Sequence, residues 1–157
     1  MLSKPKSFQS SVLRRKFVSL YLTTALAMPP FRPLHIPPLL MATSMAIGAV
    51  MPLWNPEGAI RLFGLPERIA TSQPAQACFT LYGSRATCLG MAIWIFYLQG
   101  KLKAADTILA LQGYAVAVDA YICWREGVPK KAIARALIGV VVAGWGALGL
   151  TSRGSLN

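Results

Sequence analysis

The chain has 157 residues, of which 55% are hydrophobic and only 13% are charged, and it carries a formal net charge of +11. A soluble domain has about 25% charged residues, and a small one has too much surface for its volume to bury this much apolar side chain. The totals therefore exclude an ordinary soluble domain and predict an integral membrane protein whose Lys and Arg meet anionic headgroups, with no nucleic-acid partner.

The N-terminal segment, residues 1–35, is basic, rich in serine and free of acidic residues, since the first acid is Glu57. Its apolar run, residues 17–28, covers about 12 residues and is too short for a membrane core that needs about 20. Three interpretations stay open. The segment is a secretory signal with a small-residue cleavage site ending at Ala27, a mitochondrial presequence, or a retained arm on the membrane surface.

The first predicted membrane span covers residues 37–54 and carries no charge. Pro37 and Pro38 stand at its start, where a missing N–H costs nothing, and Trp54 stands at the depth of the membrane interface. Small residues spaced four apart within it favour close contact with another helix.

A short helix is predicted directly after this span. Asn55 can cap it, Pro56 occupies its first turn, and Glu57 lies near the positive end of the helix dipole. Residues 58–65 are amphipathic, and the turn that follows Gly64 ends the helix. We expect this helix to lie in the membrane interface.

Three more spans are predicted over residues 74–98, 104–124 and 132–150. A tight basic turn at residues 99–103 joins the first two, and a polar loop at residues 125–131 joins the last two. The expected fold is all-α, a transmembrane helical bundle of about four helices with a short interfacial helix. Residues 36–151 form this membrane domain, between the N-terminal segment and a tail at residues 152–157.

Partners and location follow from this multi-pass topology. The lipid bilayer is the first partner, in an endomembrane or alternatively the mitochondrial inner membrane. Gly139, Ala143 and Ala147 repeat every four residues along the last span and form a packing face for a neighbouring helix or for a homo-oligomer.

Two charged residues lie inside the predicted spans. Arg85 is in the middle of the second span and Asp119 is inside the third, and each would cost at least about 2.5–3.5 kcal/mol if unpaired at mid-bilayer. Both lie roughly 25 Å from the 99–103 turn at about 1.5 Å per residue. An antiparallel hairpin thus places them at the same depth, so we predict a salt bridge between them.

This pair defines the candidate site. As a catalytic site, Asp119 would act as acid or base and Arg85 would orient an anion or a carbonyl group, while Tyr82 and Gln112 on the same helix faces would bind the substrate. As a structural device, the same pair would only hold two helices in register. Asp106, near the turn, is expected to be solvated, and Arg135 is expected to reach the membrane interface.

No cofactor or metal site is predicted. Phosphate-loop, dinucleotide-binding, zinc-protease and serine-hydrolase motifs are missing. The three cysteines, Cys78, Cys88 and Cys123, are scattered through apolar stretches and form no C-x-x-C pair, which excludes a disulfide framework and structural zinc.

Three short motifs give the chain a family resemblance. They are residues 58–66 (GAIRLFGLP), residues 82–85 (YGSR) followed by Gly90, and residues 118–120 (VDA). With these motifs, residues 40–150 resemble a family of small four-helix membrane proteins of unknown function that is frequent in fungi. Its members often carry a histidine near the start of the last helix, where this chain has residues 132–136 with Arg135 and no histidine.

Two roles stay open for the pair of Arg85 and Asp119 and for the protein, and the resemblance bears on the first of them. In the first, the protein is an accessory factor or an enzyme that acts on a lipophilic metabolite, as some family members are encoded beside enzymes of secondary metabolism. In the second, it is a structural or partner-binding membrane protein without catalysis. The sequence identifies no substrate or reaction.

Overall fold

The computed structural model describes residues 30–153, and every regular element in this part of the chain is helical. The three possibilities for the N-terminal segment concern mainly residues 1–29, which lie outside the described residues. The elements are η1 (Pro33–His35), α2 (Ile36–Thr43), η2 (Ser44–Gly48), η3 (Met51–Leu53), α3 (Pro56–Phe63), α4 (Glu67–Ala70), α5 (Gln73–Leu98), α6 (Leu102–Arg125), α7 (Pro129–Ala147) and α8 (Leu150–Arg153).

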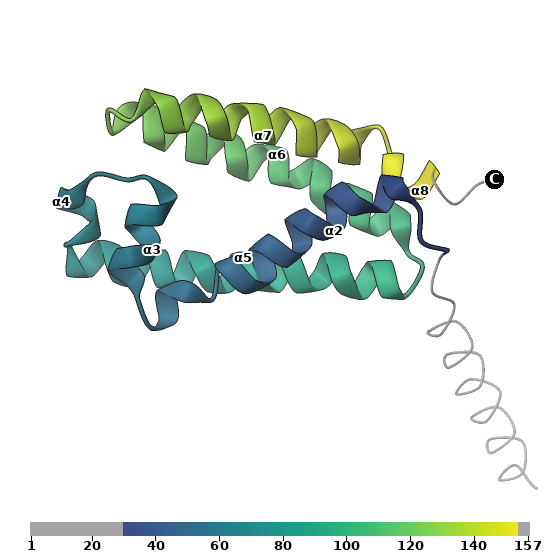
Figure 1. Ribbon diagram of the computed structural model, residues 1–157, viewed down its shortest axis with the longest axis horizontal. Coiled ribbons are helices and arrows are strands. Elements are labelled where there is room, and N and C mark those ends of the chain that lie inside the picture. Colours follow the sequence, from purple (N-terminus) through teal and green to yellow (C-terminus); the bar gives the residue numbers. More distant parts are fainter. Residues whose placement is uncertain (1–29, 154–157) are drawn as a thin grey trace, which may run out of the picture.

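Three long helices and one broken helix run along the molecule (Figure 1). Helices α6 and α7 form an antiparallel pair, and α2 with η2 lies across α5. A small apolar core joins α2, α5 and α6 through Ala42, Ile93, Ala105 and Leu109. Helices α3 and α4 lie at the same end as the α6–α7 turn, whereas η1 and α8 lie at the end of the α5–α6 turn.

The all-α fold and the positions of the long helices are confirmed to within a few residues at each end. Helices α4 and α8 were not expected, and α7 begins at Pro129, so the loop before it is shorter than predicted. Two helical stretches in the described part, Pro33–Leu53 and Leu102–Arg125, are long and apolar enough to cross a membrane by length and composition. A bundle of four membrane spans therefore stays a prediction.

The predicted caps of α3 are confirmed. The Asn55 side chain accepts a hydrogen bond from the Gly58 N–H at 2.8 Å, and Pro56 occupies the first helical position. Gly64 ends the helix with a φ of 100°, a left-handed conformation that glycine adopts without strain. A Cβ at Gly64 would also meet the side chain of Lys131 at 2.9 Å, so the end of α3 lies against the start of α7.

Close backbone contact holds α5 against the broken helix before it. A Cβ built on Gly90 would lie 2.7 Å from both the Ala42 carbonyl oxygen and the Ala46 nitrogen, and one on Gly83 would lie 2.5 Å from the Ala49 carbonyl oxygen. Only glycine lets the two backbones approach this closely. The small residues predicted on the first span thus do face a helix, and this helix is α5.

A second line of glycines joins α6 to α7. A Cβ on Gly113 would clash with Ala143, one on Gly139 with Val116, and one on Gly146 with the backbone of α6. Two of the three residues of the α7 face that was expected to pack on a neighbour, Gly139 and Ala143, therefore pack on α6, whereas Ala147 is exposed. A homo-oligomer through this face stays a prediction.

Asp106 was expected to be solvated, and this expectation is wrong. Its side chain is buried and accepts hydrogen bonds from the backbone N–H groups of Thr151 at 3.2 Å and Ser152 at 2.9 Å. It thereby binds the first turn of α8, an element that the sequence did not reveal. Beside it, His35 is fully buried and its Nδ1 lies 3.0 Å from the Tyr97 hydroxyl, so His35 fixes the start of the first helical stretch to α5.

Replacing Gly90 by alanine should destabilise the protein, because the added methyl group has no room between α5 and α2. We expect a loss of about 1–3 kcal/mol, the usual cost of overpacking. The matched control is Gly144→Ala in α7, where a Cβ meets nothing within 4 Å. This control should be neutral or slightly stabilising. Thermal unfolding in detergent measures both, and equal effects would contradict the close contact.

Candidate functional site

The carboxylate of Asp119 lies between two helices. Its Oδ2 is 3.5 Å from Nη1 of Arg135 on α7 and accepts a hydrogen bond from the Tyr82 hydroxyl on α5 at 3.2 Å. The side chains of Arg135 and Asp119 are 24% and 16% exposed, so the ion pair is largely removed from solvent. Three helices thus meet at one polar contact.

The predicted salt bridge between Arg85 and Asp119 is not formed. Arg85 is exposed on α5 and makes no ion pair with any residue in the range 30–153. The residue of α5 that reaches Asp119 is Tyr82, which lies nearly one turn before Arg85. The cation comes from α7, because the glycine contacts hold α6 close to α7.

Arg135 also ties α3 to α7. Its Nη2 donates a hydrogen bond to the Phe63 carbonyl oxygen at 2.9 Å, and its guanidinium carbon lies 3.4 Å from the centre of the Phe63 ring. The ring of Phe63 packs edge-on against Phe79 and Tyr82. A cation over an aromatic face is stabilised electrostatically, and more so where water is excluded.

A hollow of about 290 Å³ opens beside this contact. Its wall is mostly apolar and comes from η2, η3, α3, α5 and α7, with Arg135, Tyr82 and Ser44 as its polar side chains. The helix η2 in this wall is a π-helical turn, a rare conformation that often occurs at functional sites. The volume is at the lower end of the range of about 300–1,000 Å³ for small-molecule pockets.

Two of the four predicted site residues come together in the structure, namely Tyr82 and Asp119. Gln112 lies elsewhere, with its Nε2 3.2 Å from the sulfur of Met45. Arg135, which the sequence analysis assigned to the membrane interface, is the residue that it missed. The one feature of the sequence that pointed to Arg135 is its charge, close to the start of an otherwise apolar helix.

Residues 42–149 match a protein family described as a domain of unknown function, DUF4267. The chain belongs to the DUF4267 family. The match covers nearly the range that the three motifs indicated, and it includes Tyr82, Asp119 and Arg135. No curated protein and no solved structure is significantly similar to this chain.

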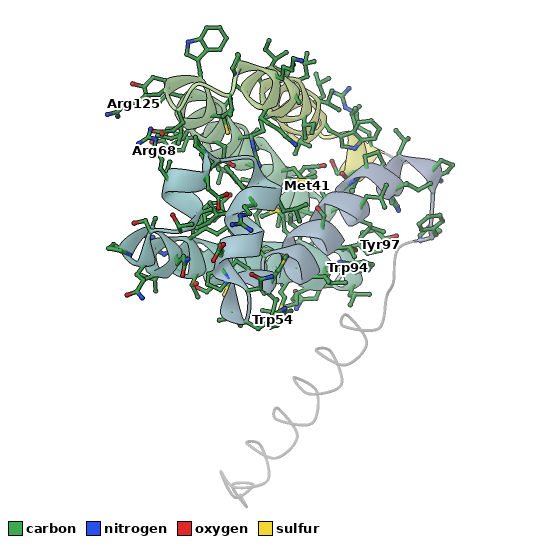
Figure 2. The ribbon with its side chains drawn as sticks, turned by 60° about the vertical axis from the view of Figure 1, so that its left-hand side comes forward. Met41, Trp54, Arg68, Trp94, Tyr97 and Arg125 are labelled. Atoms are coloured by element: carbon green, nitrogen blue, oxygen red, sulfur yellow. The ribbon has the colours of Figure 1, made fainter. Side chains whose placement is uncertain are left out.

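The DUF4267 region is bounded at one end by a polar layer. Arg61 on α3 pairs with Glu57 at 2.6 Å and with Glu67 on α4, and the hydrogen bonds that Arg61 donates to the Glu67 carboxylate raise the pKa of the Arg61 guanidinium. Arg68 pairs with Glu126 in the α6–α7 turn. Figure 2 shows Arg68 and Arg125 together at this end of the molecule.

The described residues contain no group of three or more His, Cys, Asp or Glu side chains that could hold a metal ion. Cys78 and Cys88 are exposed, Cys123 is buried, and all three are free thiols. The chemistry that the site itself offers is that of one guanidinium, one carboxylate and one phenol.

Replacing Arg135 by leucine should destabilise the protein, because it leaves the Asp119 carboxylate without its cation. Breaking a buried ion pair costs about 3–5 kcal/mol, and the partial exposure of this pair reduces the expected loss to about 1–3 kcal/mol. The double variant Arg135→Leu with Asp119→Leu should recover part of this loss.

The matched control is Arg85→Leu, which removes an arginine with no ion pair from α5 and should change stability little. Thermal unfolding in detergent compares the three variants. A larger loss from Arg85→Leu than from Arg135→Leu would restore Arg85 as the partner of Asp119.

Proposed function

We propose that this protein is a small multi-pass membrane protein that binds a compact lipophilic molecule in the hollow beside Arg135. The single observation that supports this most strongly is the composition of the hollow, an apolar wall with one guanidinium. The proposal has two parts, the membrane location and the ligand, and each has its own test.

The surface of α6 and α7 supports the membrane location. Large apolar side chains that are 40–79% exposed cover the outer face of both helices. They are Leu111, Tyr114, Val118, Tyr121, Ile133, Leu137, Ile138, Val140 and Val141. Lipid tails can surround such a surface without the free-energy cost that water would impose. Helix α6 has 24 residues and is about 36 Å long, so it can cross a hydrocarbon core of about 30 Å.

The two ends of the molecule fit the two membrane interfaces. Trp54 and Trp124 are exposed, and tryptophan is enriched at interface depth. Trp54 directly precedes the capped start of α3 and Trp124 lies in the last turn of α6, close in sequence to the polar layer of α3, α4 and the α6–α7 turn. The basic turn with Lys101 and Lys103 lies at the other end. Four crossings by the first helical stretch, α5, α6 and α7 would place both polar ends in headgroups.

The exposed face of α5 around Arg85 is the part least suited to lipid. An arginine there costs at least about 2.5–3.5 kcal/mol at mid-bilayer unless something pairs with it. If the protein forms a homo-oligomer, we expect this face to lie in the contact, since the contact would remove Arg85 from lipid, whereas Gly139 and Ala143 of α7 already pack on α6.

The membrane part predicts that the protein stays with the membrane fraction after washing with alkaline carbonate and is released by detergent. The physical reason is the apolar outer surface of α6 and α7, which would aggregate in water. A fractionated lysate with immunodetection measures this. Recovery of monodisperse protein in the soluble fraction would contradict it.

The hollow supports the ligand part. An apolar wall favours burial of an apolar molecule by about 25 cal/mol for each Å² removed from water, and a few polar groups fix its orientation. Such a site suits an accessory factor or an enzyme acting on a lipophilic metabolite, the role that the family resemblance implies, in an endomembrane or the mitochondrial inner membrane. The alternative is a structural protein in which Arg135 only joins α3, α6 and α7.

Filling the hollow separates these two functions. Ala86 lines it on α5, so Ala86→Phe should exclude a ligand and lower its binding more than tenfold, because the added ring occupies the space that the ligand needs. The control Ala77→Phe adds the same ring to an exposed position of α5 outside the hollow. Mass spectrometry of lipophilic compounds that copurify with each variant measures the difference, and identical extracts would favour the structural role.

A further inference from the structure

The polar groups on the wall of the hollow specify what kind of ligand it takes, an inference that rests on the proposed function. The wall carries three polar side chains, and each has a known set of partners in the described part of the chain. Their remaining donors and acceptors define the ligand group that would complete them.

Arg135 has donors to spare. A guanidinium has five N–H groups, and here Nη2 donates to the Phe63 carbonyl oxygen while Nη1 lies 3.5 Å from Asp119, longer than the 2.7–3.2 Å of a normal N–H···O bond. Its Nε is buried and makes no hydrogen bond within residues 30–153. Arg135 lines the hollow and therefore keeps N–H donors for an oxygen atom that would enter it.

Tyr82 and Ser44 have acceptors to spare. The Tyr82 hydroxyl donates its hydrogen to Asp119, and the Ser44 hydroxyl donates its hydrogen to the Met41 carbonyl oxygen at 2.8 Å. Each oxygen keeps lone pairs for a further donor. Tyr82 is the nearer candidate, because Asp119 joins it directly to Arg135.

The charge on the contact favours an uncharged ligand. Arg135 and Asp119 together are neutral, and the pair is largely shielded from water. An added carboxylate would leave a net negative charge beside Asp119, and an added ammonium group would leave a net positive charge beside Arg135. Either charge is costly where the dielectric constant is low.

We propose that the ligand is a compact, uncharged lipophilic alcohol or phenol. Its hydroxyl oxygen accepts a hydrogen bond from the Arg135 guanidinium, and its hydroxyl hydrogen is donated to the Tyr82 oxygen. A hydroxyl group is both donor and acceptor, so it completes both residues at once. Asp119 acts as a positioning residue. It accepts the hydrogen bond of the Tyr82 hydroxyl, so the Tyr82 oxygen is free to accept a hydrogen bond from the ligand.

Three probes of one size test this in lipid nanodiscs, with empty nanodiscs as the reference for partitioning. They are 2-naphthol, its methyl ether 2-methoxynaphthalene, which cannot donate, and 2-naphthoate, which is charged. We expect the wild-type protein to bind 2-naphthol about fivefold to tenfold more tightly than the ether, the effect of one well-made hydrogen bond, and to bind 2-naphthoate weakest.

Tyr82→Phe removes the proposed acceptor while keeping the ring. It should reduce the preference for 2-naphthol over the ether to about twofold or less. Tyr114→Phe is the matched control, since Tyr114 is an exposed tyrosine on the outer face of α6, and this variant should keep the wild-type preference.

The other outcomes separate the inference from the proposed function. Equal binding of 2-naphthol and the ether, both abolished by Ala86→Phe, would overturn the hydroxyl inference and leave a binding hollow in place. The same holds if 2-naphthoate binds tightest or if Tyr82→Phe keeps the full preference. If no probe distinguishes the wild-type protein from Ala86→Phe, the proposed function itself is wrong.

Discussion

The close contact of α6 with α7 is the constraint on which the rest of the site depends. Glycines at three levels let the two backbones approach until an added Cβ would clash, so the pair can neither slide nor turn without steric overlap. Along this contact Gly146 meets the start of α6, Gly139 meets Val116, and the next turn of α7 brings Arg135 to Asp119. Packing sets the register, and the ion pair follows from it.

Arg135 in turn determines where α3 lies. Its guanidinium donates to the Phe63 carbonyl oxygen and lies over the Phe63 ring. Phe63 is the last residue of α3, a helix with Asn55 as its N-cap and Gly64 as its C-cap. Arg135 also lines the hollow, whose wall includes the π-helical turn that is held against α5 at Gly90. One side chain thereby links the polar end of the molecule, the packing of α6 on α7, and the cavity.

The sequence predicted helices and their caps well because those depend on local chemistry. Asn55, Pro56 and Gly64 act on residues within one turn of themselves, so no knowledge of the tertiary fold was needed. The distance of Asp119 from the 99–103 turn also predicted the right region of α5, since Tyr82 lies within one turn of Arg85. The predicted cation was wrong because helix α6 has two antiparallel neighbours. The distance from a turn does not say which of these neighbours a side chain faces. Asp106 and α8 were missed for a similar reason, as a four-residue helix bound by one carboxylate has no periodic signal.

The unused N–H donors of Arg135 support our proposal that the hollow is a binding site and not a packing defect. A residue kept only to hold three helices together would be expected to use its donors on the protein, since unpaired buried donors cost about 1–3 kcal/mol each. Within residues 30–153 the Arg135 side chain donates one hydrogen bond, to the Phe63 carbonyl oxygen, and the Asp119 carboxylate stands 3.5 Å away. In the same part of the chain, Asp119 accepts its side-chain hydrogen bond from Tyr82 instead. The arrangement leaves Arg135 as a donor and Tyr82 as an acceptor on the same wall, and a group that is both at once would satisfy them at no cost to the helix contacts around them.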